Sequence, residues 1–149
     1  MKRNVTSIAN VSLSSSKPGY GVANLIDPDL ERYWQSDGPQ PHYINFEFNK
    51  RIKLSTISIY VNAKQDESYC PKVIQIKAGT SLENLQHVKK VDLSDLSGWV
   101  EIEMNEENLF INAFLVQFII LNNHLNGKDT HVRGIELYSF SDPMEEMEI

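Results

Sequence analysis

Cysteine is almost absent from this chain, since Cys70 is the one cysteine among 149 residues. A single cysteine excludes an intrachain disulfide, and such usage is typical of a reducing compartment. Apolar runs are short as well. The basic start at residues 1–6 leads into no apolar stretch, so we expect no signal peptide. The longest apolar run, 114–121, contains Gln117 and is far below the roughly 20 residues of a membrane-spanning helix.

Positive charge is in the minority. The chain has 14 Lys and Arg residues against 20 Asp and Glu residues, which gives a formal net charge of −6. This balance argues against a nucleic acid or an anionic membrane as a partner, while a basic peptide remains compatible with it. Hydrophobic residues make up 41% and charged residues 23%, as expected for one globular domain rather than a disordered chain.

Patterns that carry catalysis or metal binding are also missing. His124 and His131 are seven residues apart and only Cys70 could join them, so a four-ligand zinc site is not expected. Cys70 has no recognisable nucleophile signature around it. Paired carboxylates for glycoside hydrolysis stay open, because their separation is spatial. We therefore expect no enzyme, no metal site and no cofactor.

What the sequence does contain is a period of two, with apolar residues alternating with polar ones. This pattern predicts strands that bury one face. The run 114–121 is apolar on both faces and predicts a central strand covered on both sides. Weaker signals predict an early strand at 8–15 and short helical turns at 22–25 and 82–85. The alternating runs are 44–48, 57–61, 74–78, 100–104 and 135–138.

Turn residues separate these strands, as in Lys17-Pro18-Gly19 and Asn126-Gly127. Short strands with such turns favour an all-β protein, a β-sandwich or jelly roll. No long amphipathic helix lies between the strands, which argues against a parallel βαβ architecture.

Three polar segments lie between the predicted strands, at 33–38, 64–71 and 122–133. Loops that leave one end of a sandwich converge, and binding sites often lie on such loops. The third segment is the richest, with three Asn, two His, one Asp, one Thr, one Lys and one Arg. This set is suited to hydrogen bonding with an extended peptide or a sugar.

Structural interpretations of the same residues compete with binding. Trp34 is better explained as a core residue than as a ligand platform. His124 and His131 could each be a satisfied structural imidazole. Asp129 and Arg133 could pair to brace the loop, and Asn-Gly is a favoured turn dipeptide in its own right.

Four blocks of the chain, in order and with matching spacing, resemble the DOC domain, and more narrowly the small DOC subunit of the anaphase-promoting complex. The match runs from about residue 11 to residue 139. The blocks are LSSSKPGYGV (13–22), YWQSDGPQPH (33–42), DESY (66–69) and NHLNGKDTHVR (123–133), and SGW (97–99) also fits.

The resemblance implies a galactose-binding-like β-sandwich jelly roll over residues 1–139. It also implies a non-catalytic substrate receptor of a ubiquitin ligase that acts in the cell cycle, in the nucleus and the cytoplasm. In this family the subunit sits beside a β-propeller coactivator, and together they bind the destruction box, a degron resembling Arg-x-x-Leu. The other expected partners are the ligase's scaffold and helical-repeat subunits.

The family's degron-facing loops match Ser68 and the segment 126–131. The resemblance therefore implies that degron-binding residues are present at these positions and at their neighbours. The candidates are Ser68, Asn126, Asp129 and His131, together with Asp66, Asn123 and His124.

The C-terminus departs from the family pattern. Family members usually end in Ile-Arg, which docks on a helical-repeat scaffold subunit, whereas this sequence ends in Met147-Glu148-Ile149. We expect residues 140–149 to form a flexible acidic tail, and the sequence leaves open how this terminus attaches to the complex. A carbohydrate-binding module on the same sandwich is the alternative, motivated by aromatics such as Tyr33 and Tyr69.

Overall fold

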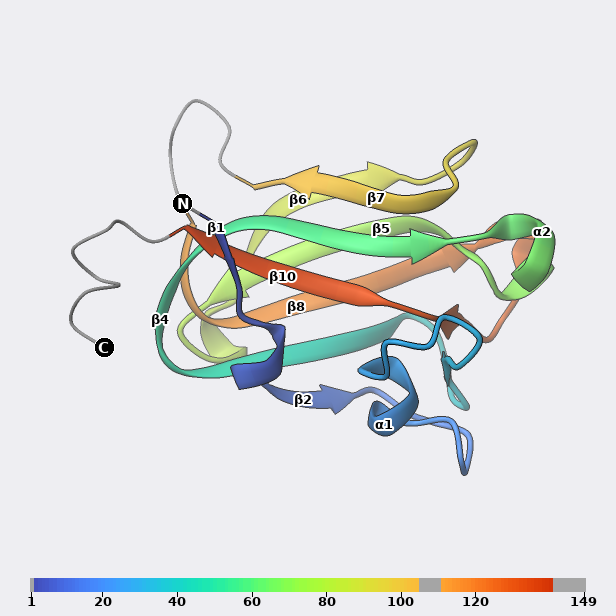
Figure 1. Ribbon diagram of the computed structural model, residues 1–149, viewed down its shortest axis with the longest axis horizontal. Coiled ribbons are helices and arrows are strands. Elements are labelled where there is room, and N and C mark those ends of the chain that lie inside the picture. The colour runs from blue at the N-terminus through green and yellow to red at the C-terminus, as the bar shows by residue number, and fades with distance from the viewer. Residues whose placement is uncertain (1, 105–110, 141–149) are drawn as a thin grey trace.

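The structure is a computed structural model that describes residues 2–104 and 111–140, and these residues form a β-sandwich (Figure 1). The strands are β1 (Lys2–Asn4), β2 (Asn10–Leu13), β3 (Trp34–Gln35), β4 (His42–Val61), β5 (Pro71–Gly79), β6 (Gln86–Asp92), β7 (Gly98–Glu103), β8 (Ile111–Asn123), β9 (His131–Val132) and β10 (Ile135–Phe140). The helices are α1 (Val22–Leu25) and α2 (Ala63–Asp66), with 3₁₀ turns η1 (Thr6–Ile8), η2 (Glu67–Tyr69), η3 (Leu82–Asn84) and η5 (His124–Asn126).

The long strand β4 belongs to both layers of the sandwich. Its residues 42–47 pair with β8, and 44–47 of them also with β2; residues 52–54 pair again with β8, and residues 54–61 pair with β10 and β7. The register against β8 shifts between Glu47 and Ile52, where the strand bends from one layer to the other. Figure 1 shows this turn at the end of the sandwich where β4 is labelled. The runs predicted at 44–48 and 57–61 are therefore two halves of one strand.

The other predicted strands are confirmed, and so is the all-β class. The run 114–121 lies in β8, between β4 and β5, which is the central position predicted for it. Val116 and Phe118 are fully buried on one face of β8, and Leu115 and Ile119 are buried on the other. The edge strand β6 was not predicted, because it contributes no fully buried side chain and its alternation is weak.

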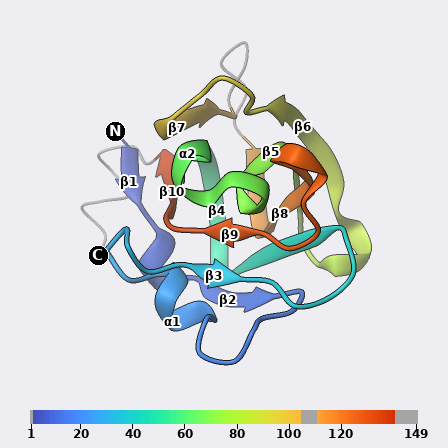
Figure 2. The same cartoon turned by 90° about the vertical axis from the view of Figure 1, so that its right-hand side faces the viewer.

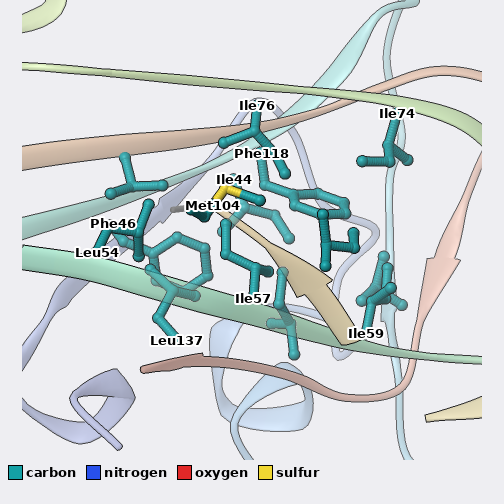
Figure 3. Packing of buried hydrophobic residues seen from close by; sticks show 14 of the residues in the cluster. Ile44, Phe46, Leu54, Ile57, Ile59, Ile74, Ile76, Met104, Phe118 and Leu137 are labelled. Carbon is teal, nitrogen blue, oxygen red and sulfur yellow. The ribbon is translucent and has the colours of Figure 1, made fainter. Parts of the chain in front are cut away.

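The core lies between the two layers (Figure 3). Ile44 and Phe46 from the first half of β4 pack into the same cluster as Ile57 and Ile59 from its second half. Fully burying one such side chain is worth roughly 1.5–3 kcal/mol, so this cluster is a major source of the stability of the fold. Substitutions at exposed loop positions should therefore leave the sandwich intact.

The predicted tail at 140–149 begins one residue inside β10, because Phe140 is the last residue of that strand. Residues 141–149 lie outside the described part of the chain. Both predicted helical turns are present, as α1 and η3. In residues 2–104 and 111–140, no helix has the length and apolar character needed to cross a membrane.

Candidate functional site

The three polar loops meet at one end of the sandwich, as the sequence predicted. Figure 2 looks onto this end, where β3, β9 and α2 lie together. Strands β3 and β9 pair antiparallel through Trp34–Val132 and Gln35–His131. The third loop is joined to the second by the backbone N–H of His124, which donates to the carbonyl of Cys70 at 2.9 Å.

Trp34 belongs to the core, which confirms its structural interpretation. Its side chain is fully buried, and its indole N–H donates to the carbonyl of Ser15 at 2.8 Å. A buried indole needs such an acceptor. Trp34 therefore fastens the first loop to the sandwich and offers no surface to a ligand.

His131 is enclosed by aromatic rings. Its imidazole stacks between Tyr33 and Tyr69, with ring centroids 3.9 and 4.1 Å apart. Its Nδ1 lies 3.0 Å from a carboxylate oxygen of Asp66, and its Nε2 lies 3.0 Å from the side-chain oxygen of Gln35. Both ring nitrogens are therefore occupied inside the protein, and only 10% of the side chain is exposed.

A buried ion pair lies beside this stack. The guanidinium of Arg133 donates to both carboxylate oxygens of Asp66, at distances of 2.8–3.2 Å. It also donates to the carbonyl of Leu30 at 2.9 Å, and it lies over the Tyr33 ring. The side chains of Asp66 and Arg133 are only 4% and 6% exposed. The suggested pairing of Asp129 with Arg133 is therefore wrong, since Arg133 pairs with Asp66.

The surroundings of Asp66 stabilise its charged form. Burial alone would raise the pKa of this carboxyl, but hydrogen bonds from His131 and Arg133, with their positive charges, hold the pKa below its ordinary value of 3.8. The folded-state pKa is therefore lower than the unfolded-state pKa. The stability that Asp66 contributes is complete above about pH 4 and is lost as pH falls through the folded-state value.

We expect acid to unfold the wild-type chain partly through this carboxyl. In thermal unfolding followed from about pH 7 to about pH 2, the Asp66→Asn variant should lose less of its own stability on acidification than the wild type loses. Asp92→Asn is the control: the pKa of Asp92 is also lowered, by hydrogen bonds from Ser94, but Asp92 is fully exposed and solvent screens it. If the stability of Asp66→Asn fell with pH as steeply as that of the wild type, this assignment would be refuted.

Asn123 and Asp129 also point inward. The Asn123 amide donates to the carbonyls of Gly127 and Asp129, at 3.3 and 2.6 Å. The carboxylate of Asp129 accepts a hydrogen bond from the Ser36 hydroxyl at 2.9 Å. Asn123 is buried and Asp129 is half-buried. These two residues brace the loop from inside.

Ser68 and Asn126 are predicted residues that lie where the second and third loops pack against each other. Asn126 is exposed and Ser68 is half-buried. The contact between their loops is very close, since a Cβ at Gly127 would lie 1.7 Å from the carbonyl oxygen of Ser68. Leu125, next to Asn126, is 78% exposed. The ring of His124 lies behind this edge, with Nδ1 3.0 Å from the Cys70 carbonyl.

Several residues of the site were not predicted from the sequence, although each lies in or near a predicted loop. They carry no signal of their own, because each is a common polar or aromatic residue whose partner is far away in sequence. The separation is 93 residues for Ser36 with Asp129 and 67 for Arg133 with Asp66. These residues are Tyr33, Gln35, Ser36, Gln40 and His42, together with Arg133 as the partner of Asp66.

The thiol of Cys70, next to the site, is held in its protonated form. Burial raises the pKa of the Cys70 thiol to about 11, and the nearby charge of Asp66 adds to this effect, while a hydrogen bond from the Asn62 backbone opposes it. No group of three or more His, Cys, Asp or Glu residues that could hold a metal ion occurs in the described ranges.

We expect Cys70 to resist alkylation in the folded protein. A thiol with a pKa of about 11 is ionised in only about one molecule in a thousand at pH 8. Iodoacetamide at pH 8 should therefore label Cys70 only after denaturant is added, as read by mass spectrometry. Labelling of the native chain at the rate of a free cysteine would contradict the burial of this thiol.

Comparison with known proteins agrees with the resemblance seen in the sequence. A family model described as anaphase-promoting complex, subunit 10 (APC10) matches residues 1–148. The chain is 42% identical over 148 residues to anaphase-promoting complex subunit 10 of Homo sapiens, covering 99% of this chain and 78% of that protein. It is 44% identical over 138 residues to the subunit 10 of Drosophila melanogaster, covering 92% and 71%.

Solved structures with the same fold have little sequence in common with this chain. The family 32 carbohydrate-binding module of Clostridium perfringens NanJ, solved with galactose, has a TM-score of 0.76 at 13% identity and covers 93% of this chain and 99% of that one. A second module, from the same organism and solved with a GalNAc-galactose disaccharide, has a TM-score of 0.75 at 11% identity, with coverage of 91% and 99%. This likeness confirms the galactose-binding-like sandwich and shows the fold alone.

Proposed function

Because the chain belongs to the family of anaphase-promoting complex subunit 10, we propose that it is a non-catalytic substrate-receptor subunit of that ubiquitin ligase. In this proposal it forms a destruction-box co-receptor with a β-propeller coactivator, and so promotes processive ubiquitination in the cell cycle. Its other partners are the scaffold and helical-repeat subunits of the ligase. It works inside the cell, in the nucleus and the cytoplasm.

One observation carries the proposal: the loop that carries the exposed Asn126 packs directly against the half-buried Ser68, beside a cluster of internally bonded residues. A hydroxyl and a primary amide can both donate to and accept from the backbone of an extended peptide. Their loops meet at Gly127 and the Ser68 carbonyl, which keeps the two residues close to each other. A loop whose backbone is already held by internal hydrogen bonds loses little freedom on binding, which favours recognition of a short degron.

The other predicted residues take a supporting role in this proposal. Asp66, Asn123, Asp129 and His131 each hydrogen-bond within the protein. They keep the loops rigid, so that two surface residues can act without rearrangement. His124 supports the same edge through the Cys70 carbonyl.

Weak binding by this site alone is consistent with the proposal. Ordering a short extended peptide offsets much of its contact energy. A second receptor on the same degron raises the effective concentration of the first, so two weak contacts hold the substrate together. Such a complex can still release a modified product.

The chemistry of the site supports a role without catalysis. The raised pKa of Cys70 keeps its thiol protonated, so it is a poor nucleophile. Both ring nitrogens of His131 are occupied, which leaves no accessible base there. A sugar-binding role has less support, because the donors of His131 and Arg133 that could meet sugar hydroxyls are directed at Asp66, Gln35 and Leu30.

We expect the Ser68→Ala, Asn126→Ala double variant to lower substrate processivity while keeping the thermal stability of the wild type. Two hydrogen bonds to a peptide are worth enough together to weaken binding about tenfold. The measurement is the number of ubiquitins added per encounter by a ligase assembled with each form of this chain.

The matched control is Gln86→Ala, an exposed side chain at the end of β6 that pairs with Ala78, far along β5 from the loops. It should leave processivity unchanged. Normal processivity in the double variant, or an equal loss in the control, would count against a receptor role for this loop pair.

A further inference from the structure

Side chains from a distant segment hold the backbone of the 126–131 loop. The amide of Gln40 donates to the carbonyl of Gly127 at 3.0 Å. Nε2 of His42 lies 2.5 Å from the carbonyl of Lys128. Because a carbonyl oxygen only accepts, His42 must carry its proton on Nε2 here. Two successive carbonyls of the loop are thus fixed by residues of 36–42, more than 80 positions away in sequence.

Ser36 adds three hydrogen bonds to the next two residues of the loop. Its hydroxyl accepts from the backbone N–H of Thr130 at 2.9 Å and donates to the carboxylate of Asp129 at 2.9 Å. Its own backbone N–H donates to the carbonyl of Thr130 at 3.1 Å. The loop is therefore held at Gly127, Lys128, Asp129 and Thr130 in succession by one short segment.

Burial makes these contacts hard to replace. Ser36 and His42 are fully buried, so solvent does not compete for their hydrogen bonds. A buried backbone group that loses its partner carries a desolvation cost. Nδ1 of His42 is buried and has no hydrogen-bond partner in the structure. The ring is thus anchored to the loop through Nε2, which the Ser36 hydroxyl also approaches at 3.3 Å.

We propose that Ser36, Gln40 and His42 are positioning residues that hold the 126–131 loop in its binding conformation. They fix the turn that carries Asn126 against Ser68, although none of them lies in the predicted degron-binding set. This inference rests on the proposed degron-receptor function. His42 is the main element, because it reaches the loop from inside the sandwich.

Two substitutions of His42 distinguish the loss of its hydrogen-bond donor from the loss of its ring. The amide nitrogen of glutamine is as many bonds from Cβ as Nε2 of histidine, whereas that of asparagine is one bond shorter. His42→Gln therefore keeps a donor for the Lys128 carbonyl, and His42→Asn does not. Binding of a synthetic Arg-x-x-Leu peptide to the ¹⁵N-labelled full chain is followed by NMR titration.

We expect His42→Asn to weaken peptide binding about tenfold and His42→Gln to change it by less than about twofold, in line with the loss or retention of one buried hydrogen bond. Equal losses in both variants, or no loss in either, would overturn the proposal. Ser36→Ala is a second variant, which removes only the hydroxyl group. In this variant the Thr130 amide hydrogen should exchange with solvent about tenfold faster than in the wild type.

Amide exchange also separates this inference from the proposed function. If the wild-type chain bound no peptide, the degron role would fail. The positioning role would still be supported by two results. The Thr130 amide should exchange faster in Ser36→Ala than in the wild type. The amides of the 126–131 loop should exchange more slowly in His42→Gln than in His42→Asn. Unchanged exchange at Thr130 in Ser36→Ala would overturn that role whatever the peptide does.

Discussion

Replacing Arg133 by leucine is expected to lower the free energy of unfolding by about 3–5 kcal/mol, the usual effect of removing one partner from a buried ion pair. The change leaves the Asp66 carboxylate buried without the guanidinium that donates to both of its oxygens. It also frees the carbonyl of Leu30. Urea unfolding of the wild type and the variant at neutral pH measures the effect.

Arg32→Leu is the matched control, because Arg32 makes a surface ion pair with Asp27 at 3.7 Å and its side chain is 60% exposed. An exposed pair is worth about 0–1 kcal/mol. The Arg133→Leu, Asp66→Leu double variant should be less damaged than Arg133→Leu alone, since it no longer buries the Asp66 carboxylate without its guanidinium. A loss below about 1 kcal/mol in Arg133→Leu would contradict the burial of this pair.

Replacing Gly127 by alanine should both destabilise the chain and separate the loops that carry Ser68 and Asn126. The new Cβ would lie 1.7 Å from the carbonyl oxygen of Ser68, so the backbone has to move. Such overpacking costs about 1–3 kcal/mol. The backbone φ of Gly127 is −63°, which alanine adopts freely, so the effect comes from space and not from conformation. We expect peptide binding to fall more steeply than for Asn126→Ala.

Gly21→Ala provides the control for this prediction. A Cβ at Gly21 would meet its nearest neighbour, the Ser16 hydroxyl, at an ordinary contact distance of 3.6 Å. Its stability and peptide binding should stay close to those of the wild type. If Gly127→Ala bound peptide as well as Gly21→Ala does, the close contact between the two loops would not matter for recognition.

The strands could be predicted from the sequence because alternation is a local property. Ile44 and Phe46 reveal the buried face of β4 without knowledge of any partner. The bend of β4 between the layers could not be predicted, since it depends on which strands pair with each half. Edge strand β6 was not predicted, because it buries no side chain fully and its half-buried residues do not alternate regularly with exposed ones.

The polar loop 122–133 was selected as a candidate binding segment because of its composition. Its many donors and acceptors suggested a ligand, on the argument that no turn needs so many. Most of them serve the protein itself: Asn123, Asp129, His131 and Arg133 all bond inward. Such pairings join residues far apart in sequence, so composition alone cannot divide a loop into bracing and binding residues.

The central claim is that Ser68 and Asn126 contact the degron, and a double-mutant cycle tests it most directly. The four reactions combine wild-type chain or the Ser68→Ala, Asn126→Ala variant with a substrate whose Arg-x-x-Leu motif is intact or mutated. Affinity of the assembled ligase with its coactivator is measured in each. We predict a coupling energy of about 1–2 kcal/mol between the two changes. Additive losses, with no coupling, would contradict a direct contact between these loops and the degron.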